Sequence, residues 1–89
     1  MAKTKREQEK ERIREVVRVI HELLLPEVNE LFKLSSDAWS ELNAVEFRGI
    51  KLTPSQKKQM QIYDQRAADL ESAKVMLGEA KIKLRYALH

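Results

Sequence analysis

A helix stop signal and a helix start signal lie close together near the middle of the chain, and this pair constrains the fold more than any other feature. Gly49 is typical of the residue just past a helix C-terminus, because glycine readily adopts the left-handed conformation found there. Thr53 is a favoured N-cap, Pro54 suits the first helical position, and Gln56 stands where a capping-box partner reaches back. A loop this short favours antiparallel helices. We therefore predict a helical hairpin with its turn at 49–53.

The composition agrees with long helices in a single domain spanning residues 1–89. The chain has only two glycines and two prolines, which leaves few positions for further turns. Aromatic residues make up 6% and charged residues 35% of the sequence, a profile typical of long helices or coiled coils. We expect an all-α, coiled-coil-like hairpin, completed into a bundle by self-association or by a partner.

The first helix is predicted over about 5–48. A capping box at Thr4 and Glu7 offers its start. Much of its apolar pattern repeats every 11 residues, which predicts a nearly straight helix. Pro26 removes a backbone donor and clashes with the carbonyl of Glu22, so we expect a kink there rather than two helices, because the stripe continues beyond it. The repeat comprises Val17, Val28 and Trp39; Ile20, Leu31 and Leu42; and Leu23, Leu34 and Val45.

The second helix is predicted over about 54–88. Its seam is a seven-residue repeat accompanied by alanines, which let two helix backbones approach closely. The first helix is longer, so residues 1–12 are expected to overhang the partner helix or to fray. A break in the first helix at Ser35–Asp37 is the alternative to a continuous one. The repeat comprises Tyr63, Leu70, Leu77 and Leu84, with Ala67, Ala73, Ala80 and Ala87 beside them.

Folding the helices together also predicts ion pairs between them, because acidic side chains of the first helix face basic ones of the second. Near the turn the expected partners are Glu41 and Glu46 with Lys57 and Lys58. Farther along, Glu22, Glu27 and Glu30 face the region of Lys74 and Lys81.

Both helices carry more apolar surface than one hairpin seam needs. The surplus predicts a protein interface, since isolated hairpins rarely leave such faces exposed to water. The alternative is a wide stripe, as in ordinary bundle helices. The partner is either a second copy, giving a homodimeric four-helix bundle, or a different protein. The predicted interface residues are Leu25, Phe32 and Trp39 on the first helix and Val75, Ile82 and Tyr86 on the second.

Basic residues gather at the open end of the predicted hairpin, where they suit a phosphate backbone or an acidic protein surface. Opposite-charge neighbours three residues away, as in Glu7–Lys10, Glu11–Arg14 and Glu15–Arg18, offer the simpler explanation of a solvated helix face. Nucleic-acid binding is therefore the second hypothesis. The basic residues concerned are Arg6, Lys10, Arg14, Arg18, Lys81, Lys83 and Arg85.

Other kinds of function find no support in the residues. The chain lacks cysteine, and neither His21 nor His89 has a ligand partner at helical spacing, so we expect no metal, cofactor or catalytic site. No apolar run approaches the ~20 residues that span a bilayer. We predict a cytoplasmic, non-enzymatic protein–protein interaction module with no membrane or small-molecule partner. Small subunits, assembly or scaffolding factors, adaptors and inhibitors are proteins of this kind.

Overall fold

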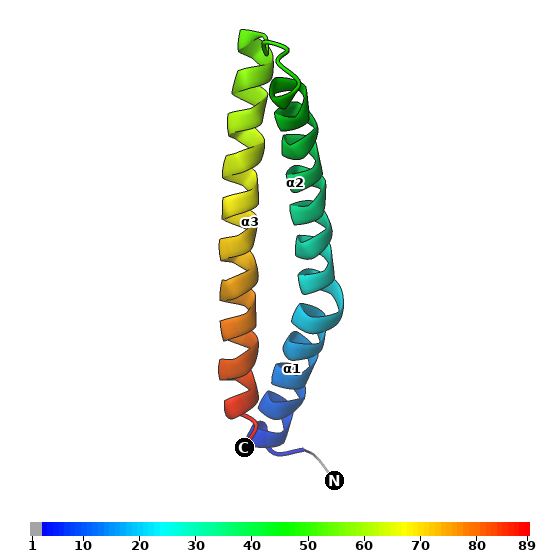
Figure 1. Cartoon of the computed structure of the whole chain (residues 1–89). Coiled ribbons are helices and arrows are strands. Elements are labelled where there is room, and N and C mark those ends of the chain that lie inside the picture. The colour runs from blue at the N-terminus through cyan, green and yellow to red at the C-terminus, as the bar shows by residue number, and fades with distance from the viewer. Residues whose placement is uncertain (1–2) are drawn as a thin grey trace.

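The computed structural model describes residues 3–89 as a long helical hairpin, which confirms the predicted fold class (Figure 1). The first arm consists of α1 (Lys5–Val19), a π-helical segment η1 (Ile20–Leu24) and α2 (Leu25–Phe47). The second arm is α3 (Pro54–Tyr86). The molecule is a rod of 71 × 17 × 16 Å. Residues 1 and 2, part of the segment predicted to overhang or fray, lie outside the described residues.

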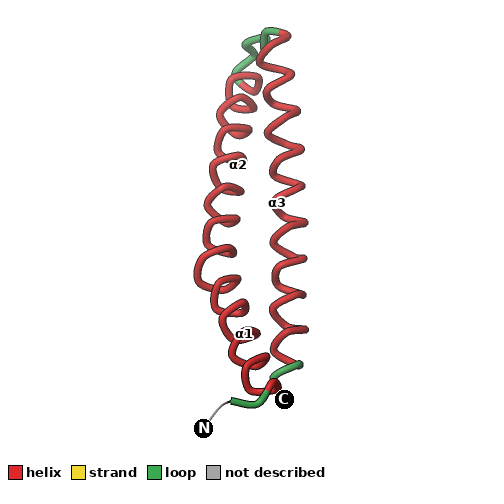
Figure 2. The backbone as a smooth tube through the Cα atoms, turned by 180° about the vertical axis from the view of Figure 1, so that it is seen from behind, coloured by secondary structure: helices red, strands yellow, loops and turns green. Residues whose placement is uncertain are grey.

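The turn forms at the predicted place, at one end of the rod (Figure 2). Gly49 adopts a φ of 83°, the left-handed conformation that ends α2. The capping box is complete: Thr53 Oγ1 accepts a hydrogen bond from the Gln56 amide at 3.1 Å, and Gln56 Oε1 accepts one from the Thr53 amide at 3.0 Å. Leu52 is buried within the turn, with 6% of its surface exposed. Local signals and one buried leucine therefore determine where the chain reverses.

The first arm is helical throughout but contains a π-helical turn directly before Pro26. There the Leu25 amide donates to the carbonyl of Ile20, five residues earlier. Pro26 follows in the first turn of α2, where its missing amide costs least. The first arm changes direction at this level (Figure 1), as expected where a π-turn interrupts a helix. The helix continues without a break through Ser35–Asp37.

The π-turn inserts one residue into the apolar repeat of the first arm. Before it, half-buried or buried residues recur in a seven-residue pattern; after it, the same pattern resumes one residue later. One residue corresponds to a rotation of about 100° around an α-helix. The seam facing α3 therefore consists of Ile13, Val17 and Ile20, followed by Leu25, Val28, Phe32, Ser35, Trp39 and Leu42.

The 11-residue prediction is wrong at three positions, and the insertion explains two of them, Leu31 and Leu34. Leu23, Leu31 and Leu34, predicted to lie in the seam, are 57%, 45% and 58% exposed. Without the inserted residue, the pattern of α1 would have continued along the side of α2 that carries Leu31 and Leu34. The π-turn rotates that side away from α3.

The seam of α3 follows the predicted seven-residue repeat. Tyr63, Leu70, Leu77 and Leu84 are all half-buried. Three of the four accompanying alanines are half-buried as well, and Ala87, beyond the end of the helix, is exposed. A single uninterrupted α-helix keeps one repeat throughout, so the simple pattern succeeds in this arm.

The predicted ion pairs between the arms do not form. Within residues 3–89, every ion pair of 4.0 Å or less joins residues at or before Glu22. Glu22 pairs with Arg18 in its own arm, and Lys81 instead donates a hydrogen bond to Nδ1 of His21 at 3.2 Å. Neighbours along one helix are held close by the backbone, whereas a pair across two exposed arms must order two long side chains for little gain.

The hairpin has almost no core of its own. Across the described part of the chain, Ile20 and Leu52 are the only buried apolar residues, at 5% and 6% exposure, and no large side chain is fully buried. Two helices contact each other along one line and cannot enclose a side chain on all sides. The stability of the isolated hairpin therefore rests on half-buried contacts.

The π-turn leads to a test by deletion, made in a Pro26→Ala background so that no proline falls inside a continuous helix. Deleting Leu23 removes the inserted residue and lets the seams before and after it join in one α-helix. We expect this variant to keep the thermal midpoint of the background protein or to exceed it, as measured by circular dichroism.

Deleting Asp37 is the matched control, since it shifts half of the α2 seam out of register. We expect a midpoint lower by about 10 °C or more. Equal losses for the two deletions would contradict the assignment of the inserted residue.

Candidate protein-docking surface

Each arm carries a second apolar stripe, offset from its seam by one residue toward the N-terminus. Because one residue turns an α-helix by about 100°, this stripe lies beside the seam. Its large members are exposed: Leu34 by 58% and Met76 by 68%, for example. We call this surface the apolar flank. It comprises Leu24, Leu31, Leu34 and Ala38 of the first arm and Ile62, Ala73, Met76 and Ala80 of α3.

A groove shows that the stripes of the two arms lie on the same side of the hairpin. Leu31, Leu34 and Ala38 of α2 line it together with Arg66 and Asp69 of α3. Ser35, Tyr63 and Leu70 complete the groove from the seam. The surface is therefore an apolar groove with one basic and one acidic side chain on its α3 wall.

The opposite flank of α2 is polar. The positions that follow the seam residues by one are Asn29, Lys33, Ser36, Ser40 and Asn43. On this side, Trp39 lines shallow grooves with Lys57, Gln61 and Asp64 of α3. Burial of the apolar flank against a partner would therefore be more favourable than burial of the polar one.

The structure separates the two sets of residues predicted as an interface. Leu25, Phe32 and Trp39 are half-buried at seam positions. Val75, Ile82 and Tyr86 are 53%, 53% and 73% exposed, and their spacing from the α3 seam places them on the outer side of that helix. Whether any of these six residues contacts a partner stays a prediction.

Sequence reasoning missed Leu24 and Ile62 as members of an exposed surface and assigned Leu31 and Leu34 to the seam. The missing signal was the one-residue offset, which recurs in both arms. This offset can be recognised only when the inserted residue of η1 is known, because the seam of α2 cannot otherwise be distinguished from its flank.

The basic residues predicted at the open end do lie at one end of the hairpin. The first turns of α1 and the last turns of α3 meet there (Figure 1). Arg6 and Arg14 lie on α1, and Lys83 and Arg85 lie near the end of α3, and all four are exposed. Lys10 and Lys81 are half-buried. The structure thus places basic side chains of both arms at one end of the hairpin, as the hypothesis of nucleic-acid binding requires.

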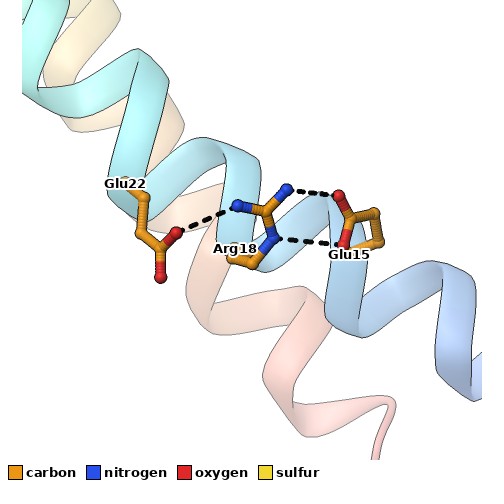
Figure 3. Close-up of polar contacts among 3 residues, drawn as sticks. All are labelled: Glu15, Arg18 and Glu22. Carbon is orange, nitrogen blue, oxygen red and sulfur yellow. Dashed lines mark hydrogen bonds and ion pairs between the residues drawn. The ribbon is translucent and has the colours of Figure 1, made fainter.

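Arg18, a member of this set, is already engaged by two carboxylates (Figure 3). Its Nε donates to Glu15 Oε2 at 3.1 Å, and its Nη1 donates to Glu22 Oε2 at 3.0 Å. The hydrogen bonds from Arg18, and then its positive charge, lower the pKa of Glu15. The same two carboxylates raise the pKa of Arg18. This side chain is therefore occupied within its own helix. Glu11 contacts Lys3 rather than the predicted Arg14.

Two further findings concern other kinds of site. Residues 3–89 contain no group of three or more His, Cys, Asp or Glu side chains arranged to hold a metal ion. None of the described helices is long and apolar enough to cross a membrane. Comparisons of the chain with protein-family models, with curated proteins and with solved structures find no match.

The Arg18 contacts lead to a prediction about pH. Because the pKa of Glu15 is lowered in the folded chain, its pairing stabilises the fold above the unfolded-state pKa, and this contribution is lost as the pH falls through the folded value. Arg18→Gln should raise the pKa of Glu15 toward its ordinary value, as followed by NMR titration of the side-chain carboxyl carbon. Arg48→Gln, at the far end of the rod, should leave it unchanged; a shift of similar size there would contradict the assigned cause.

Proposed function

We propose that this chain is a non-enzymatic protein–protein interaction module that docks its apolar flank onto helices of another polypeptide. The observation that carries the proposal is the pairing of a nearly coreless hairpin with an exposed, largely apolar groove whose α3 wall also carries Arg66 and Asp69. Helix faces with apolar side chains at this spacing are a recurring mode of protein recognition. Small subunits, assembly or scaffolding factors, adaptors and inhibitors work in this way.

The exposed surface of the chain supports this proposal quantitatively. The protein exposes 7329 Å², whereas a compact monomer of its 10.4 kDa mass exposes about 5,400 Å². The excess of about 1,900 Å² is larger than the ~800 Å² that a standard interface removes from one partner and lies within the range of about 1,000–2,500 Å² per partner for obligate interfaces. The radius of gyration, 19.9 Å, likewise exceeds the value of about 12 Å for a compact domain of this length.

The half-buried Leu25, Phe32 and Trp39 support the interface indirectly in this proposal, because they hold α2 in the orientation that presents the flank. Truncating Trp39 therefore weakens the hairpin as well as any binding. Val75, Ile82 and Tyr86 form a smaller exposed set on the outer side of α3 that can widen the contact with a large partner.

The second candidate function is nucleic-acid binding by the basic end. The observation in its favour is that basic side chains from both arms meet there. Two observations oppose it: Arg18 is occupied by Glu15 and Glu22, and the acidic side chains of α1 are interspersed among its basic ones. We therefore place it second.

Site-specific photo-crosslinking tests the proposed function whatever the identity of the partner. A benzophenone amino acid at Leu34, on the apolar flank, should form protein adducts of discrete mass in the cells that express the chain. The same probe at Ser40, on the polar flank, should form few or none. Adducts in equal amounts at both positions, or none at either, would overturn the proposal.

Charge reversal at the basic end separates the two candidate functions. We expect the combined change of Arg6, Arg14 and Lys83 to Glu to leave the Leu34 crosslinks unchanged. A nucleic-acid binder would instead retard duplex or single-stranded DNA in a gel, with affinity falling steeply as salt rises, and would lose this activity in the same variant. That pattern would favour the second candidate.

A further inference from the structure

The flank that we assign to protein docking has one occupant that its geometry specifies. We infer that the apolar flank packs against the same flank of a second copy of this chain, and that the resulting four-helix bundle has both turns at the same end. The inference rests on the proposed function, since it names the occupant of that surface.

The angle between the two stripes of each helix is the angle that a four-helix bundle needs. In a square bundle every helix contacts two neighbours, on faces about 90° apart. In both α2 and α3 the flank is offset from the seam by one residue, or about 100°. One face of each helix is already used inside the hairpin, and the other lies on the shared flank. A surface with the same construction on both helices can match a copy of itself about a two-fold axis.

The register of the arms decides which flank residues meet across the two copies. The flank of α2 carries leucines and Ala38, and that of α3 carries Ile62 and Met76 as well as Ala73 and Ala80. The groove brings Leu31 and Ala38 of α2 alongside Leu70 and Tyr63 of α3, which sets the register of the arms. With both turns at one end, each α2 lies against the other copy's α3 in this same register. Leu31 and Leu34 then lie near the level of Asp69 and Arg66 of the other copy, and Ala38 lies near the level of Ile62.

Charge selects the direction of the two copies. α2 carries five acidic and one basic side chain, whereas α3 carries seven basic and four acidic ones. Placing the turns together sets each α2 against an α3 of opposite net charge, with Glu41 near the level of Lys58 in the other copy. The reverse direction sets the two acidic α2 helices against each other. The basic ends are brought together in our arrangement, but exposed charges more than about 8 Å apart are largely screened at physiological salt.

The area available suits a stable homodimer. Removing the excess of about 1,900 Å² from each chain buries a little under 4,000 Å² in total. Obligate homodimers bury about 2,000–5,000 Å². A contact limited to the rod ends offers far less, because the rod is only 17 × 16 Å in cross-section.

Sedimentation equilibrium and small-angle X-ray scattering test the association. We expect twice the 10.4 kDa mass of one chain, with a longest dimension close to the 71 Å of a single rod. Leu31→Glu with Leu34→Glu should raise the dimer dissociation constant at least about 100-fold, because docking would bury two unpaired charges per copy. The matched control, Asn29→Glu with Ser40→Glu on the polar flank, should leave it unchanged. Circular dichroism should show that both variants remain helical, since all four positions are exposed in the hairpin.

A spin label tests the direction of the copies. The chain has no cysteine, so Ser55→Cys at the start of α3 provides a single labelling site. With the turns together, pulsed electron spin resonance should find the two labels within about 30 Å, given helix spacings of about 8–10 Å. Labels separated by nearly the 71 Å length of the rod would overturn the direction.

The remaining outcomes separate the inference from the proposed function. A monomer at all accessible concentrations that still gives discrete Leu34 crosslinks to another protein would overturn the homodimer and keep the docking function. A monomer without such crosslinks would overturn both. A dimer that survives the double glutamate substitution on the flank would overturn the assigned surface.

Discussion

The hydrogen bond from the Leu25 amide to the carbonyl of Ile20 spans five residues instead of four, and the faces of the first arm depend on it. An α-helix running through this point would present Leu31 and Leu34 to the second arm. The π-turn adds one residue and rotates everything beyond it by about 100°. Val28, Phe32 and Trp39 consequently face α3, and the leucines stand outside. Pro26, which lacks an amide and disfavours an unbroken helix, follows the irregularity directly. The π-turn therefore decides which residues of α2 form the seam and which form the apolar flank.

A two-helix rod also limits what kind of function this chain can have. Its helices touch along one line, so most side chains in the seam are only half-buried, with Ile20 and Ser35 the buried exceptions among residues 3–89. The apolar groove is open along the side of the rod, which suits a helix surface better than a small ligand. Completing such a rod with further helices turns half-buried seam residues into a true core. Folding stability and binding are therefore coupled in our proposal: the partner supplies the burial that the hairpin lacks.

Much of the fold was predictable, because its signals act within a few residues. Gly49 ends one helix, and Thr53 with Gln56 begins the next, through backbone and side-chain hydrogen bonds that involve no distant contact. The seam of α3 was equally predictable, because one repeat runs through an unbroken helix. The seam of the first arm was not. Val17, Val28 and Trp39 fit both the 11-residue repeat and the interrupted seven-residue one, while Leu23, Leu31 and Leu34 fit only the former and proved to be exposed. The ion pairs between the arms failed because facing regions of opposite charge do not dictate side-chain contacts.

The sequence by itself determined that this protein is a helical hairpin, where it turns, and that it has more apolar surface than one seam uses. These properties follow from composition, capping residues and periodicity, all of which are local. Only the tertiary structure decided which of two overlapping stripes on α2 packs against α3 and which remains outside. Those stripes differ by a single residue, and composition and periodicity do not reveal that the π-turn before Pro26 inserts it. The apolar flank is for this reason a property of the folded hairpin and not of either helix alone.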